Sequence, residues 1–141
     1  MSSNAYISYI KQNGEVVSSY LHWDGYPSHA GATLEQHYNS QELAEELVNL
    51  GDMSSIYEKI TPTGKHSYGN EEEGVCVFYC RDKGEDWESV EPQVYPSLED
   101  REKDYKGYNW YYVFKDEKWQ VYLDGKYLTV AEAIKLDEEE D

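Results

Sequence analysis

The chain has 141 residues and a formal net charge of −17, because 29 Asp and Glu residues stand against only 12 Lys and Arg residues. With 39% hydrophobic and 15% aromatic residues it is too apolar to stay disordered, and its length is that of one domain. The charge argues against direct binding to nucleic acid or anionic membranes, and no apolar run approaches the ~20 residues of a membrane-spanning helix. The N-terminus has neither the basic flank nor the apolar stretch of a signal peptide, so we expect a cytoplasmic protein.

A first β-hairpin is predicted around the dipeptide Asn13-Gly14, which lies between two runs of β-branched and aromatic residues. Asn-Gly favours a two-residue type I′ turn, and in that register Ile10 lies opposite Val17. The same register turns Trp23 toward the core, so Trp23→Ala is expected to cost about 3–5 kcal/mol. The two strands of this hairpin would span residues 5–11 and 15–23.

Two consecutive short helices are expected next, over residues 28–38 and 40–50. Ser28 and Asn39 occupy the N-cap positions of these helices, and Gly51 stands where a C-terminal cap belongs. The following residues read as a short turn or helix and then as a loop.

A middle strand is expected at 75–81, followed by a long acidic loop over 82–106 with at most one short helix near 97–103. Beyond it, Asp116-Glu117 forms the turn of a second hairpin in which Phe114 lies opposite Trp119.

In that hairpin Tyr111 and Tyr122 point away from the core, where either helices or a partner protein would cover them. After it, Thr129 and Glu132 make a capping-box pattern that opens a last helix.

These elements predict an α+β fold for residues 1–136. An antiparallel sheet of about five strands is built from the two hairpins and the middle strand, and the two consecutive helices pack on one face. A partly closed barrel of the same elements is the alternative. Residues 137–141 are all acidic, so like-charge repulsion predicts a disordered tail.

Few residues suit catalysis or metal binding. His22 and Asp24 lie beside a turn and form the one candidate acid–base pair or metal site. We expect a structural role instead, with His22 half-buried on a strand and Asp24 in an Asx turn. Cys76 and Cys80 are too far apart along a strand for a disulfide, and the acidic neighbours of Cys76 disfavour a thiolate nucleophile. No cofactor motif is present, so we expect no cofactor and no catalytic site.

The uneven charge is the strongest functional signal. Residues 71–141 hold 21 acidic and 9 basic residues, and the acids of the folded part gather between 71 and 104. Such a surface provides solubility alone, binds a basic site on another protein, or mimics nucleic acid by holding carboxylates where phosphates would lie. The predicted partner-binding residues are Glu71, Glu72, Glu73, Asp82, Glu85, Asp86, Glu88, Glu91, Glu99 and Asp100.

Several motifs resemble a family of small uncharacterised phage and prophage proteins with a His-Trp-Asp-Gly-Tyr-Pro signature, found here at 22–27. A short helix ending in His-Tyr follows, then Leu-Gly-Asp-x-Ser-Ser at 50–55 and Arg-Asp-Lys-Gly-Glu at 81–85. An aromatic hairpin at 111–119 completes the resemblance, which spans about residues 6–125.

The resemblance implies a phage-encoded accessory protein and carries no catalytic residues with it. Together with the charge, it predicts a non-enzymatic protein that acts in the host cytoplasm and inhibits a host protein with a basic surface. A defence nuclease or another nucleic-acid-binding effector is the expected target. The alternative is a small metal-dependent or hydrolytic enzyme that uses His22 and Asp24.

Overall fold

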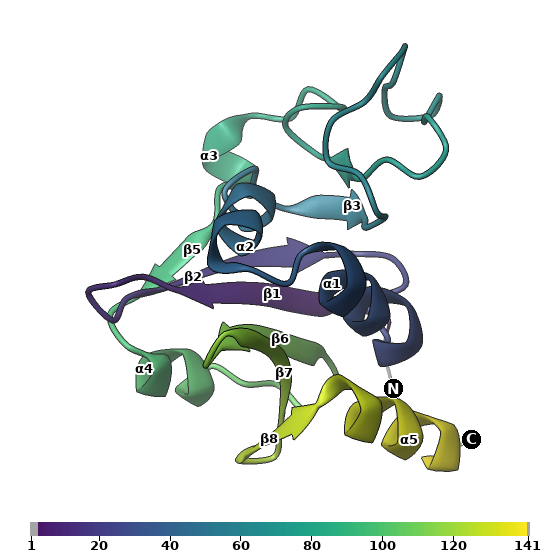
Figure 1. Cartoon of the computed structure of the whole chain (residues 1–141). Coiled ribbons are helices and arrows are strands. Elements are labelled where there is room, and N and C mark those ends of the chain that lie inside the picture. The colour runs from purple at the N-terminus through teal and green to yellow at the C-terminus, as the bar shows by residue number, and fades with distance from the viewer. Residues whose placement is uncertain (1–2, 141) are drawn as a thin grey trace.

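The computed structural model describes residues 3–140 and has an α+β fold in which helices pack on a mixed β-sheet (Figure 1). The strands are β1 (Ala5–Ile10), β2 (Val16–Leu21), β3 (Met53–Ser55), β4 (Val77–Phe78), β5 (Gln93–Tyr95), β6 (Trp110–Lys115), β7 (Lys118–Leu123) and β8 (Lys126–Thr129). The helices are the π-helical turn η1 (Pro27–Gly31), α1 (Ala32–His37), α2 (Gln41–Val48), α3 (Trp87–Val90), α4 (Leu98–Lys103) and α5 (Val130–Glu140). Within these residues no helix is long and apolar enough to cross a membrane.

The sheet differs from the predicted five antiparallel strands, because the described residues form eight strands in the order β4-β3-β2-β1-β6-β7-β8, with β5 also beside β2. The pairs β1–β6 and β2–β3 are parallel. Strands of two to four residues are too short to show an alternating pattern, so β3, β5 and β8 were not predicted, and β4 is shorter than expected. The two end strands of this order, β4 and β8, do not pair with each other.

The predicted register of the first hairpin is wrong by one residue. Ile10 pairs with Val16 instead of Val17, because residues 11–15 form a longer loop in which Gly14 alone has a positive φ (93°). A tight turn followed by a left-handed glycine is the usual alternative to the type I′ turn. The shift places Ile7 and Tyr9 with Leu21 on the buried face.

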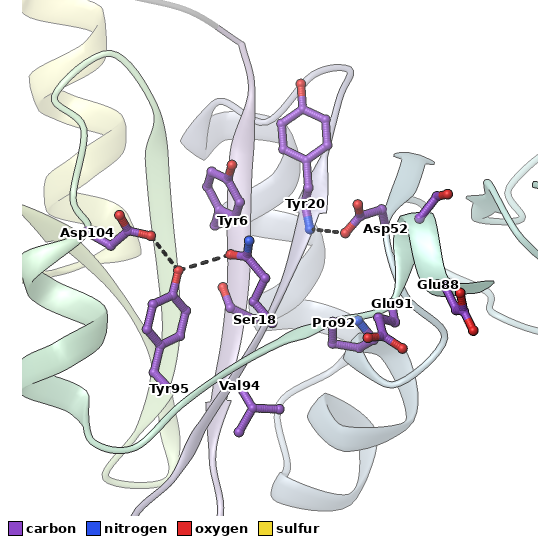
Figure 2. A pocket seen from close by; sticks show the side chains of 12 residues that line it. Tyr6, Ser18, Tyr20, Asp52, Glu88, Glu91, Pro92, Val94, Tyr95 and Asp104 are labelled. Atoms are coloured by element: carbon purple, nitrogen blue, oxygen red, sulfur yellow. Dashed lines mark hydrogen bonds between the residues drawn. The ribbon is translucent and has the colours of Figure 1, made fainter. Parts of the chain in front are cut away.

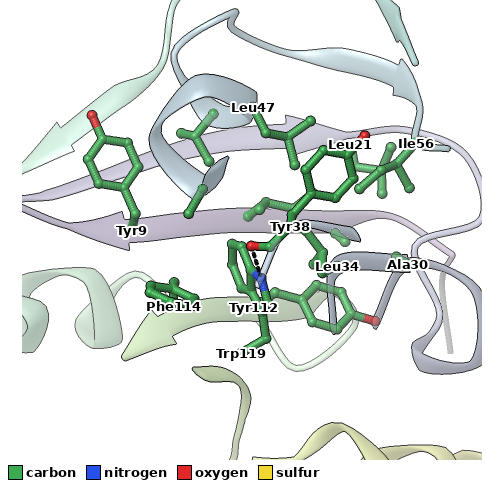
Figure 3. Close-up of a cluster of buried hydrophobic side chains, with 14 of the residues drawn as sticks. Tyr9, Leu21, Ala30, Leu34, Tyr38, Leu47, Ile56, Tyr112, Phe114 and Trp119 are labelled. Atoms are coloured by element: carbon green, nitrogen blue, oxygen red, sulfur yellow. Dashed lines mark hydrogen bonds between the residues drawn. The ribbon is translucent and has the colours of Figure 1, made fainter. Parts of the chain in front are cut away.

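The main core lies between that face of the sheet and the helices η1, α1, α2 and α5 (Figure 3). Trp119 donates its indole N–H to the backbone oxygen of Tyr38 over 2.9 Å, and the Tyr112 hydroxyl donates to the Gly25 oxygen over 2.6 Å. Gly25 passes so close to residue 5 that a Cβ atom would lie 2.7 Å from the Ala5 Cβ, which explains a glycine there. Its φ is not positive; the left-handed residue of this turn is Asp24, with φ 55°.

The two predicted helices are present and pack on one face, but their starts differ from the prediction. Pro27 occupies the first turn of η1, whose N-cap is Tyr26, so Ser28 is not a cap. Helix α2 is capped by Ser40, whose hydroxyl accepts from the Leu43 N–H over 3.1 Å, and not by Asn39.

The second hairpin agrees with the sequence. Phe114 pairs with Trp119 across a turn in which Asp116 and Glu117 both have positive φ, and Thr129 and Glu132 form the expected reciprocal cap.

The acidic C-terminus differs from the disordered tail that the sequence predicts, because α5 continues through residue 140; Asp141 lies outside the described residues. The buried Ala133 packs the first turn of α5 against the domain. The Leu and Glu residues that follow have high helix propensity, so the helix continues.

Candidate functional site

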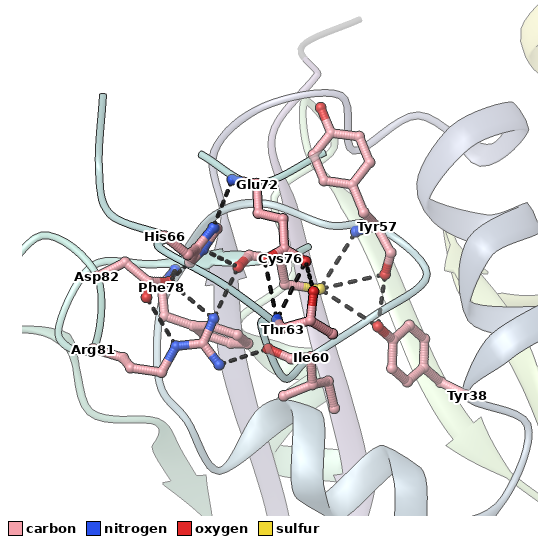
Figure 4. A network of polar contacts seen from close by, with 10 residues as sticks. All are labelled: Tyr38, Tyr57, Ile60, Thr63, His66, Glu72, Cys76, Phe78, Arg81 and Asp82. Carbon is pink, nitrogen blue, oxygen red and sulfur yellow. Dashed lines mark hydrogen bonds and ion pairs between the residues drawn. The ribbon is translucent and has the colours of Figure 1, made fainter. Parts of the chain in front are cut away.

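The acidic residues predicted to form one surface do not lie together, and the structure has two acidic regions of different kinds. The first region belongs to an irregular loop beside β4 (Figure 4). There Asp82 is not a surface residue: its side chain is 4% exposed, accepts from the Phe78 N–H over 2.8 Å and pairs with Arg81 at 2.9 Å. The buried ring of His66, which sequence reasoning did not single out, lies 3.4 Å from the same carboxylate. We call Asp82, Arg81, His66 and Phe78 the Asp82 network.

Neighbouring acids of this loop also have internal roles. Glu72 accepts from the backbone N–H groups of Thr63 and Gly64 over 3.0 and 2.8 Å, which holds its pKa below the usual range. Its own N–H donates to Nδ1 of His66 over 2.9 Å, so Nε2 carries the ring proton and donates to the Cys76 oxygen. Glu72 therefore organises the loop, while Glu71 and Glu73 are exposed.

The second region lines a cleft of about 930 Å³ between the α3–β5 segment and the sheet (Figure 2). Its carboxylates come from three places in the chain, and its floor is made by tyrosine side chains of β1 and β2, on the face opposite the main core. We call this the acidic cleft; its carboxylates are Asp52, Glu88, Glu91 and Asp104, and its tyrosines are Tyr6, Tyr20 and Tyr95. No Lys, Arg or His belongs to its lining among the described residues.

Asp52 is the most enclosed of these carboxylates. It accepts from the Tyr20 N–H over 3.0 Å, where the edge of β2 changes neighbour from β5 to β3. A backbone donor in that gap has no strand partner, so the carboxylate replaces one. Desolvation raises the pKa of Asp52 to about 6, although the Tyr20 hydrogen bond opposes the shift. The ionised form of a partly buried carboxylate is costly unless it is paired. A cation that enters the cleft would therefore interact favourably with Asp52.

At the other end of the cleft a guanidinium already lies among tyrosine rings. Arg101 of α4 is 4% exposed and its central carbon lies 4.5–5.1 Å from the ring centroids of Tyr6, Tyr95 and Tyr111. The Tyr95 hydroxyl donates to Asp104 over 2.6 Å, and Asp104 lies 3.9 Å from Arg101. Burial and this bond raise the pKa of Tyr95 to about 12. Tyrosines and carboxylates at this face thus bind a cation within the protein itself.

Helix α4 and the residues after it cover the tyrosines that point away from the main core. Tyr111 is 4% exposed beneath Arg101 and Tyr105, whereas Tyr122 is only half-buried. The cover comes from α4 and the residues after it, not from α1 and α2.

The remaining predicted residues lie outside the cleft lining. Glu85 lies 3.6 Å from Lys83, Glu99 lies 3.7 Å from Lys103, and Asp100 accepts from the Ser97 hydroxyl over 2.9 Å. Asp86 precedes α3 without forming a side-chain cap. Of the ten predicted residues, Glu88 and Glu91 alone line the cleft.

Sequence reasoning missed the other lining residues. Asp52 follows a helix-ending glycine and Asp104 follows α4, positions that are common for structural residues. One sequence feature could have indicated the floor of the cleft: tyrosines that pair across neighbouring strands, such as Tyr6 and Tyr20. The predicted register, which was wrong by one residue, did not pair these two tyrosines.

The side chain of His22, in the signature at 22–27, contacts neighbouring aromatic residues of the chain. Nδ1 of His22 lies 2.8 Å from the Tyr20 hydroxyl, and the ring packs edge-on against Trp23 with centroids 4.5 Å apart. Trp23 is 54% exposed, so the prediction of a core tryptophan is wrong: the one-residue register shift ends the buried face at Leu21. The described residues contain no group of three His, Cys, Asp or Glu that could hold a metal ion.

Cys76 is buried and hydrogen-bonded, as expected of a structural thiol. Its sulfur lies 3.3 Å from the Tyr57 nitrogen and 3.4 Å from the Tyr38 hydroxyl, and desolvation raises its pKa. Cys80 is also free but only half-buried, and neither cysteine forms a disulfide.

The comparisons with known proteins give no relative from which roles can be transferred: no family model, curated protein or solved structure matches this chain. The resemblance to phage proteins therefore stays a prediction.

Proposed function

We propose that this is a non-enzymatic binding protein whose acidic cleft recognises a basic site on a partner protein. The observation that carries the proposal is the cleft itself. Within the described residues Asp52, Glu88 and Glu91 form no salt bridge with a Lys or Arg side chain, and tyrosine side chains line the same cleft. A cleft with unneutralised carboxylates and aromatic walls suits a lysine or arginine side chain.

The expected partner is a host nuclease or another nucleic-acid-binding effector, and the protein inhibits it by occupying its basic site. This part of the proposal rests on the charge of −17 and on the resemblance to phage proteins. Attraction between the two surfaces accelerates association at low salt. Salt weakens this attraction, because the screening length falls to about 8 Å at physiological ionic strength.

The test compares two charge reversals of equal size. Glu88→Lys with Glu91→Lys alters the cleft, whereas Glu138→Lys with Glu139→Lys alters exposed positions on α5, at the opposite end of the molecule (Figure 1). Both double variants change the net charge equally. Immobilised wild-type protein and the α5 variant should retain the same basic protein from a bacterial lysate, and the cleft variant should lose it.

Two further readouts sharpen this test. Duplex DNA should release the captured protein if its basic site normally binds nucleic acid. Equal capture by both double variants would show that total charge, and not the cleft, is responsible, and the proposal would then be wrong.

A further inference from the structure

The outer edge of β5 is the least protected backbone beside the cleft. Among the described residues β5 pairs with β2 alone, and its central residue Val94 is 57% exposed. An open strand edge presents unpaired N–H and C=O groups that another chain can use. Pro92 and Pro96 lie directly before and after the strand, so this edge is limited to three residues.

Two hollows meet at this strand from opposite faces of the sheet. The acidic cleft lies on the face of Ser18 and Tyr20, and Figure 2 shows the Tyr95 ring turned into it while Val94 points the other way. On the other face a groove of about 470 Å³ lies over Tyr9 and Val17.

This second hollow, which we call the Trp87 groove, is lined mostly by apolar and aromatic side chains. Its walls include Trp87, which is 43% exposed, and Val94. Lys11 also lines it, but its ammonium lies 3.1 Å from Glu15 and Glu91 lines the same groove. The apolar walls, and not charge, therefore distinguish this groove from the cleft. Glu91, Pro92 and Val94 belong to both hollows and form the ridge between them.

We infer that β5 binds an extended segment of the partner in which basic and apolar residues alternate. This inference rests on the proposed function and specifies its partner. Successive side chains of a strand point to opposite faces of a sheet. A strand added beside β5 therefore directs every second side chain to the acidic cleft and the others to the Trp87 groove. Main-chain pairing supplies affinity in this mode, and the two hollows supply specificity.

The experiment uses two labelled lysine–valine peptides of equal length and composition, one strictly alternating and one with its lysines and valines in separate blocks. Fluorescence anisotropy with the full chain at low salt should show the alternating peptide binding about ten-fold more tightly. Val94→Asn changes no charge at an exposed position, and it should reduce that ratio to about three-fold. Amide hydrogen exchange of Gln93–Tyr95 should slow in the complex.

The outcomes separate this inference from the proposed function. Equal affinity for both peptides, lost together in the Glu88→Lys/Glu91→Lys variant, would overturn strand addition and leave the basic-site proposal standing. Failure of both peptides to bind, or binding that the same variant leaves unchanged, would overturn both. A ten-fold preference without slower exchange at β5 would also overturn strand addition, because the peptide would then lie elsewhere.

Discussion

The two acidic regions of the protein use their carboxylates in opposite ways. In the Asp82 network the carboxylate is 4% exposed and bonded to Arg81 and to the backbone of β4. In the acidic cleft Glu88 and Glu91 are exposed and pair with no Lys or Arg in the described chain. The same residue type therefore maintains the fold in one region and leaves charge available for a partner in the other. Net charge alone does not distinguish them.

The largest expected effect tests the structural side of this comparison. Asp82→Ala removes the acceptor of the Phe78 N–H and the partner of Arg81, and it should lower the free energy of unfolding by about 3 kcal/mol. Urea denaturation measures the change. The control Glu85→Ala, at an acid that lies 3.6 Å from Lys83, should stay within about 0.5 kcal/mol. Equal effects at both positions would remove the distinction between the two regions.

Asp52 combines features of both acidic regions, because it is partly buried and also lines the cleft. Its folded pKa of about 6 lies above the unfolded value, so folding favours the protonated form. The penalty of the charged form is therefore present above pH 6 and disappears as the pH falls through 6 toward 4. Asp52→Asn should be more stable than the wild type at pH 7 by about 1 kcal/mol, allowing for solvent at the partly exposed group.

The stability difference between wild type and Asp52→Asn should vanish at pH 4, where the wild-type carboxyl is also neutral. Thermal denaturation of both proteins at a series of pH values measures it. A difference that is constant with pH would show that the carboxylate is not desolvated in the cleft.

Charge reversal inside the cleft should change stability much less than the loss of Asp82. Glu91→Lys sits at an exposed position without a basic partner, so the free energy of unfolding should change by less than about 0.5 kcal/mol. Partner binding should nevertheless fall strongly. A large loss of stability in this variant would mean that the cleft carboxylates maintain the fold, as Asp82 does.

The C-terminal acidic residues should contribute neither to stability nor to partner binding. Deletion of residues 137–141 removes the last turn of α5, which contains no apolar residue, and should leave the melting temperature almost unchanged. Differential scanning calorimetry of the truncated chain measures this. A drop of several degrees would show that the tail packs on the domain.

Local chemistry made several elements predictable from the sequence. The turn residues Asp116-Glu117 and the apolar pair Phe114–Trp119 fixed the second hairpin, and the pair Thr129–Glu132 fixed the start of α5. Each of these features depends on residues within a few positions of one another. Neighbouring residues carry that information whatever the remainder of the chain does.

Tertiary structure decided the first hairpin and the cleft. The longer loop at Gly14 reversed which side chains of β1 and β2 share a face, and so brought Tyr6 and Tyr20 together under the cleft. Asp52 and Asp104 reach this cleft from segments that are far apart in the sequence. Whether a carboxylate is neutralised or left free depends on which segments pack against it. Arg81 and Phe78 are close to Asp82 in the sequence, but the fold places the buried His66 beside it and encloses its carboxylate. The fold also leaves Glu91 without a Lys or Arg in the cleft lining among the described residues.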